Sequence, residues 1–104
     1  MDLNPSTNNA LFPARSVAYT GTAGSTATWP LDPTIRAVLV WCTTDAYIAI
    51  GDSVTATTND LPLPAYTPVV LPIVANVPGS SSWRVSAIQI AAGGTVYAKP
   101  LTQQ

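Results

Sequence analysis

The 104-residue chain has no histidine and no glutamate, and it has only one lysine (Lys99) and one cysteine (Cys42). Enzymes draw most of their proton-exchanging groups from these four residue types. A cysteine or serine nucleophile also needs a neighbouring base, and Cys42 lies beside Trp41 in the most apolar stretch of the chain. We therefore expect Cys42 to be a buried, inert thiol and the protein not to be an enzyme, with no catalytic residue and no cofactor.

Charge is also scarce. Only 9% of the residues are charged and the net charge is −1, whereas a typical soluble domain has about 25% charged residues. The four cationic residues are far apart in the sequence, which is too little positive charge for a run of phosphates, so we expect no nucleic-acid partner. No apolar run approaches the roughly 20 residues of a membrane span, and residues 1–5 do not have the pattern of a signal peptide. We expect no membrane partner.

The five carboxylates are all aspartates. Asp45, Asp52 and Asp60 fall in predicted turns beside Thr, Ser or Asn, where an aspartate accepts hydrogen bonds from nearby backbone amides. No loop has the dense acidic alternation of a calcium site, so we expect no metal site. Gly93-Gly94 lacks the Lys-Ser/Thr that follows in a phosphate-binding loop, and it is typical of a hairpin turn.

The chain is rich in residues that suit strands and rigid turns, with fourteen threonines and ten prolines. Apolar runs of strand length at 35–41, 46–50, 83–90 and 95–99 are separated by Gly, Pro and Thr turns. We expect the first two runs to form one hairpin and the last two another. The prolines at 62 and 64 exclude a central strand there. The pattern predicts an all-β fold: a single antiparallel β-sandwich or small barrel, jelly-roll-like.

Residues 1–33 differ from the rest and are predicted to form an extended N-terminal arm, with the β-sandwich domain at 34–104. Leu11 and Phe12 are apolar residues stranded in this arm, and Trp29 follows in a proline-stiffened stretch. We expect Trp41 and Tyr47 to fill the core, and Trp29 and Trp83 to be the better candidates for exposed contacts. A chain with so few charges favours oligomerisation or docking on a larger particle, because large exposed apolar patches usually mark interfaces.

From Ile35 onward the chain resembles the small β-rich virion structural proteins of tailed bacteriophages. The order that carries the resemblance is a strand with a Gly turn, a Thr-rich loop, an "LPA" segment with an extended strand, and a terminal hairpin. The matching stretches are residues 44–51, Thr55-Ala56-Thr57, Leu63-Pro64-Ala65, Tyr66-Thr67-Pro68, residues 87–90 and residues 93–97.

The resemblance implies a virion structural protein, and we expect a capsid decoration (cement) protein that binds and stabilises the outer shell. Its partner would be the major capsid protein, it would form a homo-oligomer with a trimer favoured, and it would be made in the host cytoplasm and reside on the capsid surface. The residues expected to contact partners are Leu11, Phe12, Val17 and Tyr19 in the arm, and Trp29 and Trp83 between copies. Two alternatives stay open: a neck, tail or head-fibre component, and a carbohydrate-binding or host-adhesion module.

Overall fold

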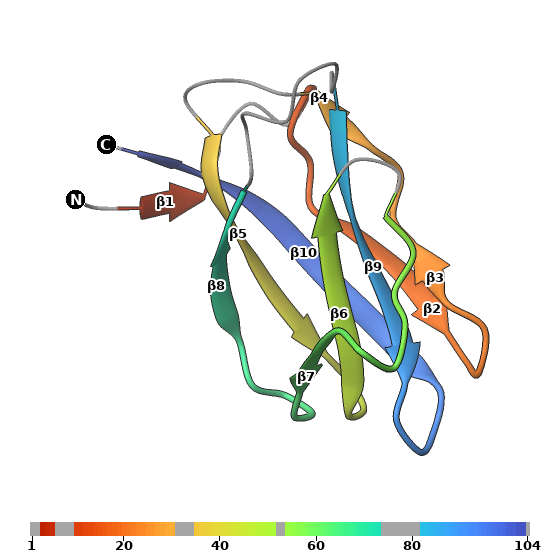
Figure 1. Cartoon of the computed structure of the whole chain (residues 1–104). Helices are drawn as coiled ribbons and strands as arrows, with labels where there is room; N and C mark the ends of the chain where they lie inside the picture. The colour runs from red at the N-terminus through yellow and green to blue at the C-terminus, as the bar shows by residue number, and fades with distance from the viewer. Residues whose placement is uncertain (1–2, 6–9, 31–34, 52–53, 74–81, 104) are drawn as a thin grey trace.

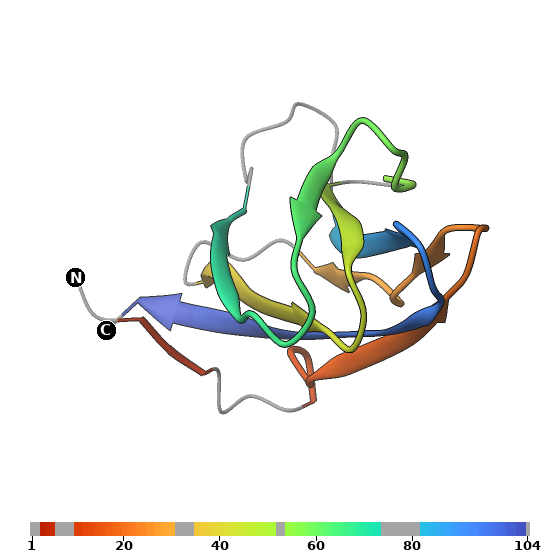
Figure 2. The ribbon, with the colours of Figure 1, turned by 90° about the horizontal axis from the view of Figure 1, so that it is seen from below.

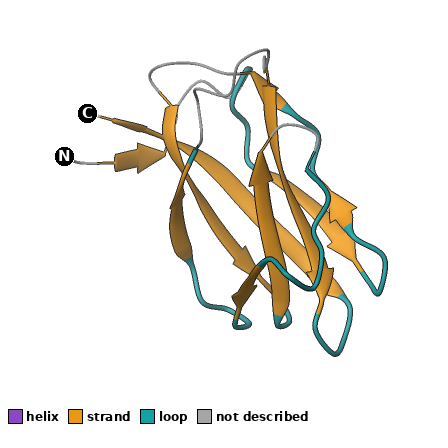
Figure 3. Cartoon of the chain, viewed as in Figure 1, coloured by secondary structure: helices purple, strands orange, loops and turns teal. Residues whose placement is uncertain are grey.

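The computed structural model describes residues 3–5, 10–30, 35–51, 54–73 and 82–103, which form strands and no helix (Figure 3). The strands are β1 (Leu3–Pro5), β2 (Arg15–Tyr19), β3 (Gly24–Ser25), β4 (Trp29–Pro30), β5 (Ile35–Cys42), β6 (Ala46–Gly51), β7 (Leu61–Leu63), β8 (Val69–Pro72), β9 (Ser82–Gln89) and β10 (Gly94–Gln103).

The strands lie in two antiparallel sheets packed face to face (Figures 1 and 2). Sheet A has the order β1-β10-β5-β8, and β2 also pairs with β10; sheet B has the order β3-β9-β6-β7, and β4 also pairs with β9. With β3 and β4 taken as two pieces of one interrupted strand, β2 to β10 make eight strands. Their neighbour orders are then 1-8-3-6 and 2-7-4-5, which is the jelly-roll arrangement. The predicted jelly-roll-like β-sandwich is confirmed.

Both predicted hairpins are wrong. β5 pairs with β10 and β8, whereas β6 pairs with β9 and β7, so the turn at 43–45 carries the chain from one sheet to the other. The loop at 90–93 likewise links β9 of sheet B to β10 of sheet A. A short turn of Thr or Gly residues indicates that the chain reverses. It does not show whether the next strand pairs in the same sheet or crosses the core to the other sheet. Here the Thr43 amide donates to the Thr95 carbonyl (3.0 Å), and the Thr95 amide donates to Thr43 Oγ1 (2.9 Å).

The core lies between the sheets and is built from the inward-facing residues of the long strands. On β5 these are Val38, Val40 and Cys42, and on β10 they include Val96 and Ala98. Each fully buried large apolar side chain contributes roughly 1.5–3 kcal/mol to folding.

Four strand prolines lie at the sheet edges: β1, β4, β7 and β8 contain Pro5, Pro30, Pro62 and Pro72. A fifth, Pro100, lies in the central strand β10, between the stretch that pairs with β2 (94–98) and the stretch that pairs with β1 (101–103). A proline cannot donate to a strand ladder, so it is tolerated at an edge and discourages further strand pairing there. Among the described strands, β7 pairs with β6 alone, which confirms that residues 61–64 are not a central strand.

The described part of the N-terminal segment lies along the sandwich. β1 and β2 both pair with β10, and β3 and β4 both pair with β9. β2 and β3 approach so closely that a Cβ at Gly24 would stand 2.2 Å from the Ala18 carbonyl oxygen. The predicted boundary at residue 33 lies outside the described residues and stays a prediction.

Candidate functional site

The predicted contact residues between copies, Trp29 and Trp83, are buried in the core. They stand opposite each other on β4 and β9, with ring centroids 4.5 Å apart. The Trp29 indole Nε1 donates to the Pro13 carbonyl (2.9 Å), and the Arg15 guanidinium lies 5.6 Å from the Trp29 ring centroid. The expected exposure of these tryptophans is therefore wrong, because their strand pairing directs both rings inward.

The predicted arm contacts divide into buried and exposed residues. Phe12 and Tyr19 are buried, Val17 packs against the core, and Leu11 is 50% exposed. Of these four, Leu11 offers a partner a large exposed surface in this structure. A role for any of them in partner contacts stays a prediction.

Tyr19 ties together three segments at one end of the sandwich. Its hydroxyl donates to the Thr44 carbonyl (2.8 Å) and lies 2.7 Å from Thr44 Oγ1, which in turn donates to the Ala92 carbonyl (2.9 Å). Burial raises the pKa of the Tyr19 hydroxyl. The contacts join the end of β2 to the β5–β6 turn and the β9–β10 loop, so Tyr19 positions loops in this structure.

Cys42 is buried and burial raises its pKa to about 11, which confirms the prediction of a buried thiol and leaves it protonated near neutral pH. Asp60 Oδ2 accepts the Thr57 amide (2.7 Å), as expected for a turn aspartate. Asp45 Oδ1 accepts the Ala65 amide (2.8 Å), so it joins its turn to the β7–β8 loop. Asp52 lies outside the described residues. Among the residues described, no three His, Cys, Asp or Glu side chains gather as a metal site.

Trp41 and Tyr47 are not core residues, contrary to expectation. Inward-facing residues flank each of them, so both point to the outer faces of their sheets and are only partly buried. On sheet A the Trp41 ring stacks on Tyr97 (centroids 4.5 Å apart, 15° between planes) and is tilted against Tyr66 (5.9 Å, 32°). These three residues are called the aromatic row.

One end of the aromatic row reaches a set of turns that we call the loop end: residues 20–23, 43–45, 64–68 and 90–93, at the lower end of the molecule in Figure 1. Tyr66 is 68% exposed there and Ile90 is 43% exposed. The Tyr66 amide donates to the Cys42 carbonyl (2.8 Å), and the Ile90 amide donates to the Asp45 carbonyl (3.2 Å). Tyr66 is thus fixed to the end of β5, and Ile90 to the turn that follows it.

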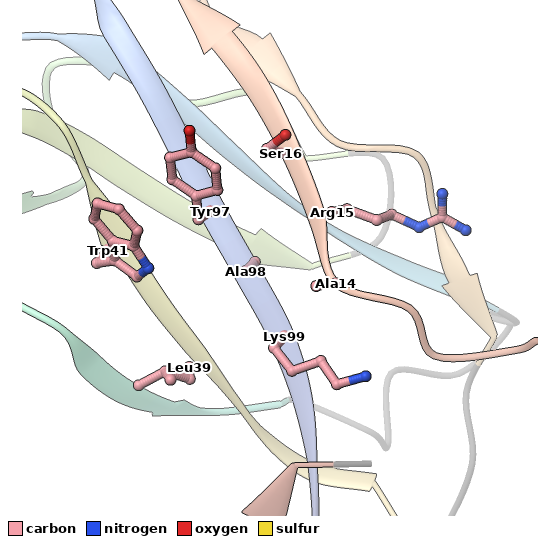
Figure 4. Close-up of a pocket in the computed structure, with 8 residues that line it drawn as sticks. All are labelled: Ala14, Arg15, Ser16, Leu39, Trp41, Tyr97, Ala98 and Lys99. Atoms are coloured by element: carbon pink, nitrogen blue, oxygen red, sulfur yellow. The ribbon is translucent and has the colours of Figure 1, made fainter. Parts of the chain in front are cut away.

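The other end of the aromatic row borders a groove on the outer face of sheet A (Figure 4). Its volume is about 300 Å³, and we call it the sheet groove. Lys99 follows Tyr97 on the same strand face, and its ammonium donates to the Phe12 carbonyl (2.8 Å). The groove is lined by Ala14, Arg15, Ser16, Leu39, Trp41, Tyr97, Ala98 and Lys99.

The residues predicted to contact partners do not include Tyr66, Ile90 or Tyr97. A signal for Tyr97 exists, because Val96 and Ala98 alternate with Thr95, Tyr97 and Lys99 and so predict an outward tyrosine. Nothing comparable marks Tyr66, whose surroundings are set by a backbone contact with a strand 24 residues earlier, at Cys42.

The described residues contain no helix long and apolar enough to cross a membrane. Comparison of the chain with known protein families, with curated proteins and with solved structures gives no significant match.

Proposed function

We propose that this chain is a bacteriophage virion structural protein, and that it acts as a capsid decoration protein which docks on the major capsid protein through the loop end. The proposal combines the resemblance described above with the geometry of Tyr66. The neck, tail or head-fibre role is the alternative that the same geometry allows.

The conformation of Tyr66 is the observation that supports the loop end as the docking surface. Its φ is +54°, in the left-handed region that costs a non-glycine residue roughly 1–2 kcal/mol. The ring is largely exposed, so burial within the chain does little to offset this cost. Strain held at an exposed aromatic residue is typical of functional positions, and a contact with a partner would give the ring the burial that the isolated chain does not.

The surroundings of Tyr66 also favour a protein partner. Its backbone is hydrogen-bonded to β5 and its ring lies against Trp41, so the main chain at the anchor is already ordered and little backbone entropy is lost on docking. Across the loop end, Asp45 alone is charged, and its carboxylate already accepts the Ala65 amide. A surface of small neutral residues around an aromatic anchor suits contact with an apolar patch.

The test is the copy number of this chain in purified particles, relative to the major shell protein. Copies near parity would support decoration of the capsid lattice. A small number that matches a portal or tail ring would support the neck or tail alternative. Absence from the particle would refute both virion roles.

A second experiment tests the surface itself. Particles without this chain would be mixed with purified wild-type protein, Tyr66→Ala or Tyr97→Ala, and bound protein would be measured after sedimentation. We expect Tyr66→Ala to dock at least about tenfold more weakly, a loss of about 1.4 kcal/mol. Tyr97→Ala removes a tyrosine from the same aromatic row but outside the loop end, and it should dock as wild type does. Equal docking by Tyr66→Ala would contradict the assigned surface.

A further inference from the structure

We propose that the sheet groove is a carbohydrate site in which a pyranose ring of an oligosaccharide stacks on Tyr97. The sheet groove lies on the outer face of sheet A, whereas the proposed docking surface is the loop end. The inference therefore goes beyond the proposed function and does not depend on it.

Tyr97 has one aromatic face covered and one face available. In the strand register Tyr97 lies between Trp41 of β5 and Ser16 of β2, and Figure 4 shows the three in that order. Trp41 stacks in near-parallel orientation on one face of the Tyr97 ring. On the β2 side the groove is lined by Ser16 and Ala14, which are too small to cover the other face. Tyr97 is accordingly 39% exposed.

The groove combines this aromatic surface with polar groups at its border. The Lys99 ammonium is held at a fixed place by the Phe12 carbonyl. Within the part of the chain that is described, the hydroxyls of Ser16 and Tyr97 form no side-chain hydrogen bond. The negative face of an aromatic ring attracts the C–H face of a pyranose, while the sugar hydroxyls need polar partners around it.

The charged residues that line the groove and the volume of the groove agree with a sugar ligand. Of the two cationic residues that line the groove, Arg15 places its guanidinium over Trp29, whereas Lys99 lies on the same strand face as Tyr97. The volume of about 300 Å³ is at the lower end of small-molecule sites, roughly 300–1,000 Å³. The wall is also rigid, because β10 is paired on both sides and Trp41 supports the Tyr97 ring, so binding orders little of the protein.

Intrinsic fluorescence of the full chain offers a direct assay. Trp29 and Trp83 are buried, whereas Trp41 is partly exposed beside Tyr97, so a ligand in the sheet groove changes mainly the Trp41 emission. The probes are hexasaccharides of cellulose, maltose and chitin type, together with hyaluronan and polygalacturonate fragments, each titrated to millimolar concentration. Amide chemical shifts of Ser16 and Tyr97 locate the contact.

Three variants separate a sugar site from a general effect on the fold. Tyr97→Ala removes the stacking face, and Ser16→Leu fills the groove while it leaves Tyr97 in place. Tyr66→Ala is the matched control, because it removes another tyrosine of the aromatic row outside the groove. We expect at least a tenfold loss of sugar affinity in the first two variants and unchanged affinity in the third, with thermal unfolding of each variant measured alongside.

Binding of at least one probe with this pattern of variants would support the site. Failure of every probe to bind the wild-type chain, or equal binding by folded Ser16→Leu, would overturn it. The result is independent of virion docking, since Tyr66→Ala is expected to lose docking and keep sugar binding, and Tyr97→Ala is expected to do the reverse.

Discussion

Replacement of Gly24 by alanine should strongly destabilise the sandwich. The added Cβ would lie 2.2 Å from the Ala18 carbonyl oxygen and 3.1 Å from the Ala18 carbonyl carbon, whereas ordinary contacts begin at 3.4 Å. The neighbour would have to retreat by about 1.2 Å, the difference between 3.4 and 2.2 Å. Both segments are fixed in ladders, because Ala18 pairs with Thr95 and Gly24 pairs with Ala87. Relief of the overlap therefore loosens one of the sheets.

The expected cost is about 2–3 kcal/mol, the upper part of the range for overpacking a core. For a domain of this size, that corresponds to a fall of roughly 10–20 °C in the melting temperature. Urea unfolding followed by tryptophan fluorescence measures the free energy of unfolding. Gly21→Ala is the control, since its Cβ would meet the Gln89 side chain at an ordinary 3.7 Å and should be neutral or slightly stabilising. If both variants unfold at the same urea concentration, the reasoning about the β2–β3 contact is wrong.

Three further predictions concern Tyr66, Ser86 and Cys42. Tyr66→Asn should keep the free energy of unfolding or raise it by up to about 1 kcal/mol, whereas Tyr66→Val should lower it by about 1 kcal/mol. The reason is that asparagine tolerates the left-handed backbone and a β-branched residue does not. Equal urea midpoints of the two variants would contradict this. Ser86→Ala should lower the free energy of unfolding, measured in urea, by about 1–3 kcal/mol. The Ser86 hydroxyl accepts a hydrogen bond from the buried Ala56 amide (2.9 Å) and donates one to the Gly24 carbonyl (3.1 Å). An unchanged urea midpoint would show that another group takes over the hydrogen bonds of this hydroxyl. Burial raises the pKa of Cys42 from 9.0 to about 11, so the stability from its protonated form is fully present below pH 9 and is lost as the pH rises through about 11, a loss of about 2–3 kcal/mol. The free energy of unfolding of Cys42→Val should therefore decline less steeply between about pH 9 and 11. An equal decline in the variant and the wild type would refute the assignment.

The sequence predicted the class of the fold and the burial of the cysteine because both depend on local patterns. Strand-length apolar runs between Gly and Pro turns indicate a sandwich, and cysteine is among the residue types most often fully buried. The pairing of strands was not predictable in the same way. The turns at 43–45 and 90–93 look like hairpin turns, but they join different sheets, since Thr43 pairs its backbone with Thr95 rather than with β6.

The candidate site was harder to predict because it depends on which face a side chain occupies. Trp29 lies in a proline-rich stretch that looks exposed, yet it stacks on Trp83 in the core. Trp41 lies in a run of six apolar residues with no polar alternation, so nothing local shows that it points outward. The left-handed conformation of Tyr66 accompanies a tertiary contact with β5, and no glycine marks this position in the sequence.

The pairing of β1 with the end of β10 has a consequence for where the backbone of this fold can be opened and closed. Leu3 and Gln103 are opposite each other in the register, so two positions a hundred residues apart in the sequence are neighbours in space. A linker of a few residues joining them would close the β1–β10 antiparallel pair with a turn and give a circular chain. New ends could then be opened in the exposed 57–59 stretch between β6 and β7, where insertions are tolerated best. Such a circular permutant should keep the jelly roll, the loop end and the sheet groove, because none of them depends on where the backbone is interrupted.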